Sequence, residues 1–289
     1  MKSRLTGMAA SVLLGALVAP TAFADPIGYS AWDIYSGNDR LVRVNLATGV
    51  AQTIGTNIGF SDIDGLAFSA SGQLYGVDDS TNKLVAIDTT TGAGMAIGSG
   101  FGSGFNDMGL AFVGNSLYMA STNGSGVGQL YAVDTGTGGA TLIGSFGDGL
   151  KVRSLGAHGN ALYGWSNIDT LVTINTTTAA YTTVGPFGFP NLTEGQDGMD
   201  IDPASGTVWA ISEFENRTYT LSKTTGAATV FATSLTCDGA PCYDSGRFNG
   251  LAIAPVPEPG SYAMMLAGLG LLGLIARRRG RLGAWREVH

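Results

Sequence analysis

The fold is decided by residues 74–98, which read LYGVDDSTNKLVAIDTTTGAGMAIG. This stretch contains three short apolar segments, at 74–78, 84–87 and 95–97, and polar turns separate them, as is typical of neighbouring β-strands. The middle segment and its turn recur as LVRVNLATG (41–49), LYAVDTGTG (130–138), LVTINTTTA (171–179) and TYTLSKTTG (218–226). Four of the five turns end in Gly, which suits a positive-φ position, and an Asp or Asn four residues earlier can bond the turn backbone.

A second type of strand opens each unit of this repeat. Its copies are DGLAF (64–68), MGLAF (108–112), RSLGA (153–157), DGMDI (197–201) and NGLAI (249–253). The second residues of these segments, at 65, 109, 154, 198 and 250, are spaced by 44, 45, 44 and 52 residues. Four strands per unit of this length predict an all-β fold, a five-bladed β-propeller over residues 25–254.

The ends of the repeat region predict how the propeller closes. The last opening strand, 249–253, has no blade after it, whereas the first unit, from Trp32, has no opening strand before it. We therefore expect the C-terminal strand to pair with the first blade near Trp32. A β-solenoid and a two-sheet sandwich remain as alternative folds. One aromatic residue per unit is expected to pack blade on blade rather than bind sugar, namely Trp32, Tyr75, Tyr118, Tyr163 and Trp209.

Residues 1–24 have the three parts of a secretory signal peptide. Lys2 and Arg4 precede an apolar core at 9–18, and Ala22-Phe23-Ala24 is a small-x-small cleavage site. Cleavage is expected between Ala24 and Asp25. An uncleaved membrane anchor is the alternative, although the core is short for a span.

The C-terminal region combines three features. Pro257-Glu258-Pro259 is followed by the uncharged segment 262–276, which we expect to form a transmembrane helix. A basic cluster that should remain cytoplasmic comes next, with a cytoplasmic tail at 282–289. The cluster consists of Arg277, Arg278, Arg279 and Arg281.

This three-part order resembles the PEP-CTERM sorting signal of exported proteins of Gram-negative bacteria, here over residues 255–281. The resemblance implies that exosortase, an inner-membrane cysteine protease or transpeptidase, releases the protein from a transient membrane helix. It also implies a final location at the cell surface or outside the cell, in association with exopolysaccharide or biofilm. The tail at 282–289 departs from the usual pattern, and an ordinary C-terminal anchor remains the alternative.

Charge and cysteine content exclude several classes of protein. Residues 25–261 carry 8 basic and 21 acidic side chains, a net charge of −13, which opposes binding to nucleic acid. The two cysteines of the chain, Cys237 and Cys242, are expected to form a disulfide in an exported protein.

The sequence offers little catalytic chemistry. His158 is the one histidine of the mature body, so neither a Ser-His-Asp triad nor a histidine metal cage is expected, and we predict no catalytic residue, metal or cofactor. Two carboxylate pairs, Asp62 with Asp64 and Asp200 with Asp202, are too short for an EF-hand loop, and calcium binding stays an open alternative.

Polar residues immediately before or within the start of the innermost strands are candidate ligand-binding residues, because these strands line the channel of a propeller. They are Asp62, Asp64, Asn106, Asp107, Lys151, Arg153, Glu194, Asp197, Arg247 and Asn249. We expect them to meet at one mouth of the ring and form a polar pocket. The sequence therefore favours a non-catalytic binding or structural propeller, with exopolysaccharide or another surface protein as partner. The alternative is a secreted hydrolase of sugars or lactones, with Asp64 or Asp197 as general base and Glu194 as acid.

Overall fold

The computed structural model describes residues 25–33, 37–188, 198–212, 217–242, 247–255 and 270. The predicted signal peptide, Pro257 to Pro259, Glu194 and Asp197 lie outside these residues. So do the predicted transmembrane helix at 262–276, apart from residue 270, the arginine cluster and the tail at 282–289. Within the described ranges, the structure contains no helix with the length and apolar character needed to cross a bilayer.

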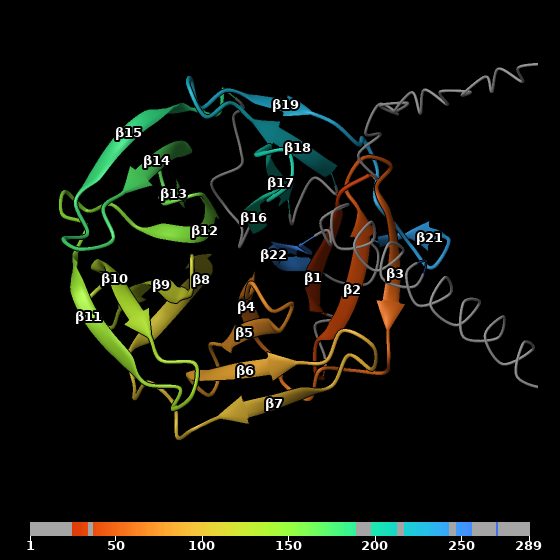
Figure 1. The fold of residues 1–289 in the computed structure, drawn as a ribbon, viewed down its shortest axis with the longest axis horizontal. Coiled ribbons are helices and arrows are strands. Elements are labelled where there is room, and N and C mark those ends of the chain that lie inside the picture. Colours follow the sequence, from red (N-terminus) through yellow and green to blue (C-terminus); the bar gives the residue numbers. More distant parts are fainter. Residues whose placement is uncertain are drawn as a thin grey trace, which may run out of the picture.

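The body is all-β and is arranged as the predicted five-bladed propeller (Figure 1). Blade 1 runs outward from β22 (Arg247–Ile253) through β1 (Ile27–Asp33) and β2 (Arg40–Asn45) to β3 (Val50–Ile54). Blade 2 contains β4 (Ile63–Phe68), β5 (Leu74–Asp78), β6 (Lys83–Ile87) and β7 (Gly94–Ile97). Blade 3 contains β8 (Phe105–Val113), β9 (Ser116–Asn123), β10 (Gly128–Val133) and β11 (Ala140–Ser145). Blade 4 contains β12 (Val152–His158), β13 (Ala161–Ser166), β14 (Thr170–Ile174) and β15 (Tyr181–Pro186). Blade 5 contains β16 (Gly198–Ile201), β17 (Val208–Ser212), β18 (Arg217–Leu221) and β19 (Ala228–Val230).

The repeated turn between the third and fourth strands has the predicted geometry. In blade 2, the Asp88 Oδ1 atom accepts hydrogen bonds from the backbone N–H groups of Thr90 and Thr91, at 2.7 and 2.9 Å. Gly92 ends this turn at φ +76°, in the left-handed region that glycine occupies without a Cβ clash. Blade 4 has Ala179 at the equivalent place, and this residue adopts φ +61°.

The innermost strands form a ring around the channel axis. β4 contacts β8, β8 contacts β12, β12 contacts β16, β16 contacts β22, and β22 contacts β4. Glycine permits this close approach: a Cβ on Gly65 of β4 would lie 2.5 Å from the Met108 carbonyl oxygen of β8. A Cβ on Gly250 of β22 would lie 2.4 Å from the Asp64 carbonyl oxygen, so the second residue of the opening motif brings adjacent blades together.

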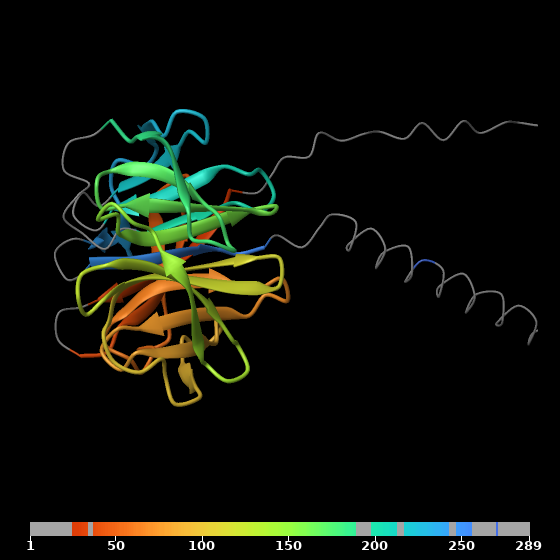
Figure 2. The same ribbon diagram turned by 90° about the vertical axis from the view of Figure 1, so that its left-hand side faces the viewer.

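The C-terminal strand pairs with the first blade, in the region that the sequence indicates. β22 is antiparallel to β1, with Trp32 opposite Phe248 and Gly28 opposite Ile253. Figure 2 shows β22 passing through the middle of the ring. The pairing corrects one detail of the repeat alignment: Tyr75 lies opposite Ala67, and its counterpart in blade 1 is Tyr29, opposite Ala252, rather than Trp32. A bulge between Tyr29 and Ala31 shifts the register there and hides this equivalence in the sequence.

The apolar core consists of five clusters, each shared by two adjacent blades. The cluster between blades 5 and 1 contains Trp32, Trp209, Phe248 and Leu251. Tyr75, Tyr118 and Tyr163 pack against three of the other clusters. The repeated aromatic residues therefore pack blade against blade, as expected.

The insert in the longest repeat interval covers the outer edge of blade 1. Here β20 (Thr236–Cys237) pairs in parallel with β3, and β21 (Ala240–Pro241) pairs with β20. Cys237 and Cys242 form the predicted disulfide, with their Cα atoms 5.0 Å apart. The Asp238 carboxylate fastens the hairpin to β3, because it accepts hydrogen bonds from the Thr53 N–H at 3.1 Å and the Thr53 hydroxyl at 2.7 Å.

Candidate functional site

The ring has two mouths. We call the face where the innermost strands begin, near Ile63 of β4, the start mouth, and the face where they end, near Phe68, the end mouth. Because neighbouring strands of a blade are antiparallel, the connections β3–β4 and β5–β6 also lie at the start mouth.

The start mouth carries the predicted polar residues that the structure describes. Asp62 and Asp107 are half-buried beside Asp64, which is 5% exposed. The Asp64 Oδ2 atom accepts a hydrogen bond from the Met108 N–H of blade 3 at 3.3 Å. Asp64 therefore joins two blades and offers little surface to a ligand.

Burial and neighbouring charge change the protonation of these carboxyl groups. Desolvation raises the pKa of Asp64 well above its usual value, and the charges of Asp79 and Asp62 raise it further. Desolvation and the charge of Asp78 likewise raise the pKa of Asp62.

Three further aspartates belong to this group, and the sequence analysis did not assign them to it. Asp39 is fully buried, and its Oδ2 atom accepts the Ile63 N–H at 2.7 Å, which links blade 1 to blade 2. Burial raises the pKa of Asp39 to about 7, and burial together with Asp62 raises the pKa of Asp79 to about 6. The third is Asp78, at the end of β5. The antiparallel order of the strands within a blade could have identified these three aspartates, because it brings the end of the second strand and the start of the third to the start mouth.

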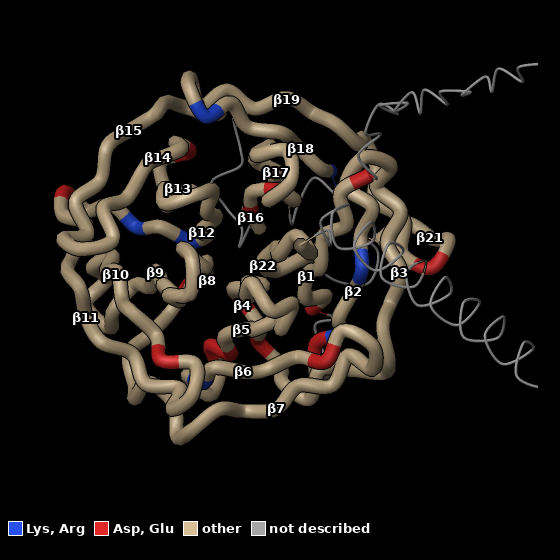
Figure 3. Tube along the Cα trace, in the orientation of Figure 1, with Lys and Arg blue, Asp and Glu red and all other residues tan. Residues whose placement is uncertain are grey.

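The remaining predicted residues of the start mouth lie mainly in other blades. Asn106 is exposed and Asn249 is buried, and the Asn249 carbonyl oxygen accepts the Ser30 hydroxyl at 3.1 Å. Lys151 and Arg153 are half-buried at the start of blade 4, where burial raises the pKa of Asp169 and the charge of Arg153 partly opposes this rise. Half-buried Arg247 lies opposite Asp33 in the β22–β1 pair. Acidic positions gather around β4, β5 and β6, and basic positions occur around β12 (Figure 3).

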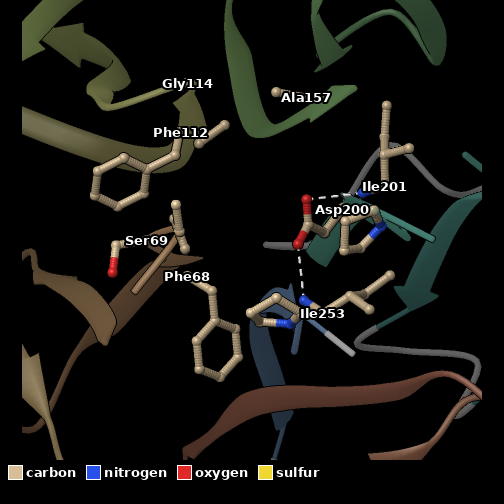
Figure 4. Close-up of a pocket in the computed structure, with 13 residues that line it drawn as sticks. Phe68, Ser69, Phe112, Gly114, Ala157, Asp200, Ile201 and Ile253 are labelled. Carbon is tan, nitrogen blue, oxygen red and sulfur yellow. Dashed lines mark hydrogen bonds between the residues drawn. The ribbon is translucent and has the colours of Figure 1, made fainter. Parts of the chain in front are cut away.

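The end mouth holds a cavity of about 170 Å³ that the sequence analysis did not predict. All five innermost strands contribute to its lining (Figure 4). The lining includes Phe68 of β4, Phe112 of β8, Ala157 of β12, Asp200 of β16 and Ile253 of β22. Most of the cavity wall is apolar, so the Asp200 carboxyl group is surrounded mainly by aromatic and aliphatic side chains.

Asp200 connects blade 5 to blade 1. Its Oδ1 atom accepts the Ile201 N–H and its Oδ2 atom accepts the Ile253 N–H, both at 2.7 Å. Burial raises the pKa of Asp200 to about 7, against the opposite effect of these two hydrogen bonds, and the nearby charge of Asp202 raises it slightly.

Both described ends of the body lie at the end mouth. The Ala254 N–H donates a hydrogen bond to the Ile27 carbonyl oxygen at 3.1 Å, directly after the pairing of Ile253 with Gly28. Pro255 itself lines the cavity.

The described residues provide no ready metal centre. Within those ranges, no three His, Cys, Asp or Glu side chains are placed so that they could hold a metal ion together. His158 is exposed at the end of β12.

Comparison with known proteins identifies one region and one fold. Residues 255–279 match the PEP-CTERM protein-sorting motif, and no curated protein matches the chain. A solved structure of a protein of unknown function from Bacteroides thetaiotaomicron VPI-5482 is similar at 12% identity, over 67% of this chain and 56% of that chain, with a TM-score of 0.45. A chain of a nidogen/laminin complex is similar at 13% identity, over 80% of this chain and 81% of that chain, with a TM-score of 0.50.

These similarities have different scope. The 13% identity to the chain of the nidogen/laminin complex shows similarity of fold alone. The sorting motif implies a protein that is exported, anchored in the membrane and then processed by exosortase.

Proposed function

We propose that this chain is a non-catalytic binding propeller, which exosortase processing places at the cell surface or in the extracellular matrix. Its ligand would be an exopolysaccharide or another surface protein, bound at the start mouth. One observation carries this proposal: the sorting motif begins at residue 255, two residues after β22 ends at Ile253.

The short connection supports a defined orientation before processing. Six residues separate Pro255 from Tyr262, where the predicted transmembrane helix starts, and an extended chain covers these seven Cα-to-Cα steps in about 25 Å at most. The end mouth would then face the inner membrane, with Arg277, Arg278, Arg279 and Arg281 in the cytoplasm. The start mouth would face away from the membrane and meet ligands first. Export would begin with signal-peptide cleavage between Ala24 and Asp25.

The chemistry of the start mouth supports a polar ligand. It combines half-buried carboxyl groups around Asp62 and Asp107 with the cationic Lys151 and Arg153 across the ring. Carboxylates accept hydrogen bonds from sugar hydroxyl groups, and lysine and arginine donate to acidic sugars or acidic proteins. A chain of similar fold in a nidogen/laminin complex is consistent with protein binding. A role in biofilm is the broader form of this proposal.

Pairing of β22 with β1 would keep the ring closed in the processed protein. A cut near Pro257 leaves both strands intact, because β22 ends at Ile253. The mature body would therefore keep its fold after it leaves the membrane helix.

The hydrolase alternative has one supporting observation, the raised pKa of Asp64, which is a property of many general acids and bases. Against it, Asp64 is 5% exposed and bonded to Met108, so a polymeric substrate does not reach the carboxyl group in this conformation.

Glycan-array and exopolysaccharide binding by residues 25–255 tests the proposed function. We expect stable binding without turnover, and we expect Asp62→Asn combined with Lys151→Ala to weaken it at least tenfold. Asp134→Asn combined with Lys223→Ala is the control, because these residues lie in the β10–β11 and β18–β19 turns, on the face opposite the start mouth, and the two substitutions remove the same charges. Hydrolysis without stable binding, abolished by Asp64→Asn, would support the hydrolase instead. Equal binding by the two double variants would exclude the start mouth.

A further inference from the structure

One position of the opening-strand motif holds a small residue in four blades and an aspartate in the fifth, and this aspartate lines the end-mouth cavity. The fourth position of the opening motif is Ala67, Ala111, Gly156 and Ala252 in four blades, and it is Asp200 in blade 5. A small side chain suits this position because neighbouring blades meet there: a Cβ on Gly156 would lie 3.1 Å from the Asp200 Cα atom. A carboxyl group therefore occupies a place where the ring otherwise has at most a methyl group.

Among the described residues, two backbone N–H groups hold the Asp200 carboxyl group in place. Its two oxygens each accept one backbone N–H, from Ile201 and Ile253, and each carboxylate oxygen can accept a further bond. Among the described residues that line the cavity, Asp200 is the only charged one. Asp202, the nearby group that affects its pKa, is also acidic.

Two aromatic rings complete the wall. Phe68 and Phe112 are half-buried and border the same hollow as the Asp200 carboxyl group (Figure 4). Their orientation is fixed from behind, because Phe68 packs on Tyr29 with ring centroids 5.3 Å apart and Phe112 packs on Tyr75 at 5.7 Å. The face of an aromatic ring attracts a cation, as does a carboxylate.

We propose that the end-mouth cavity binds the ammonium group of a small organic amine, with Asp200 as its counter-ion and Phe68 and Phe112 as its aromatic walls. The volume of about 170 Å³ corresponds to about six water molecules, so the occupant is a small amine or a single amino-sugar residue. This site is separate from the start mouth, and the proposal does not depend on whether the start mouth binds a ligand.

Proton linkage provides one signature of the site. Burial raises the pKa of Asp200 to about 7, so at about pH 5.5 most of the molecules carry the protonated carboxyl group. Binding of an ammonium ion requires the carboxylate and releases the proton. The apparent Kd is therefore expected to rise at least about fourfold between about pH 7.5 and pH 5.5.

The experiment is an NMR titration of residues 25–255 that follows the Ile201 and Ile253 amide signals, whose protons are donated to Asp200. Ethanolamine and glucosamine, each up to about 10 mM, are compared with their uncharged counterparts ethylene glycol and glucose. We expect saturable shifts with the amines and none with the uncharged compounds. Tighter binding of glucosamine identifies an amino sugar, tighter binding of ethanolamine identifies a smaller amine, and both support the site.

Substitutions test the two parts of the site separately. Asp200→Asn keeps the shape of the side chain and should weaken amine binding at least tenfold, whereas Asp88→Asn, in an exposed turn, should leave it unchanged. Phe112→Leu should weaken binding about three- to tenfold, and it provides the test if the Asp200 variant does not fold. Equal shifts with the uncharged compounds, no shift with either amine, or unchanged binding by Asp200→Asn would overturn the proposal.

Discussion

Asp39, Asp79 and Asp200 show at the residue scale how this fold treats its carboxyl groups. Each is removed from water to a degree that raises its pKa, to about 7 for Asp39 and Asp200 and about 6 for Asp79. Asp39 and Asp200 nevertheless join blades, because each accepts a backbone N–H from the neighbouring blade. The same side chains therefore link the ring and oppose its stability when they are charged.

The raised pKa values predict that stability falls as pH rises. Since the folded-state values exceed the unfolded value of about 3.9, the native state binds more protons between about pH 4 and pH 7. The free energy of unfolding should therefore decrease over this interval, and a shift of one pKa unit corresponds to about 1.4 kcal/mol at most. The hydrogen bonds that lower the pKa of Asp88 and Asp134 stabilise the fold above about pH 4, and this contribution is lost only as the pH falls below that value.

Urea unfolding at a series of pH values measures this dependence. Asp39→Asn keeps an acceptor for the Ile63 N–H and should flatten the profile, whereas the exposed-turn variant Asp88→Asn should not change the slope above about pH 4. Stability that increases from about pH 5 to pH 8 would contradict the assignment of raised pKa values.

At the scale of single elements, the β20–β21 hairpin is held by its disulfide and by Asp238. Replacing both Cys237 and Cys242 by Ser should cost about 2 kcal/mol or less, because the closed loop is short. The loss should be local to the edge of blade 1. Hydrogen exchange should therefore accelerate at Thr236 and Asp238, whose N–H groups bond Gly49 and Ala51, and stay unchanged in blade 3. Faster exchange throughout the ring would instead assign the hairpin a global role.

The sequence predicted the elements well where a repeat fixed their register. The strands, the aspartate-capped turns and the pairing of the last strand with the first blade all follow from the spacing of five similar units. In blade 1, Trp32 was aligned with Tyr75 although Tyr29 is the structural counterpart. The bulge after Tyr29 changes the strand register, and the sequence shows no pattern that indicates it.

The candidate sites were harder to predict than the strands, because the ring has two mouths. The charged residues of the sequence indicated the start mouth, where Asp62, Asp64 and Asp107 lie close together. The contribution of Asp39 was not predicted, because it depends on tracing the connection between the second and third strands to the same mouth. The end-mouth cavity was not predicted either, although Asp200 interrupts a repeat of small residues.

At the scale of the whole molecule, the contact between blades 5 and 1 packs the C-terminal strand β22 against the preceding blade. Leu251 of β22 is 1% exposed in this contact, and Leu142 of β11 is 52% exposed. Leu251→Ala should lower the free energy of unfolding by about 2–5 kcal/mol, whereas Leu142→Ala should change it by less than about 0.5 kcal/mol. Chemical denaturation of both variants measures the difference, and similar values would show that this contact contributes little.

The pairing of β1 with β22 has a consequence for timing. A chain that crosses the membrane from its N-terminus delivers β1 first, and that strand has no partner at the channel axis until residue 253 has crossed. The next residues to arrive are those of the sorting motif, from 255 onward. Completion of the ring and delivery of the sorting motif should thus be nearly simultaneous, and we expect the body to finish folding while the chain is still anchored in the membrane.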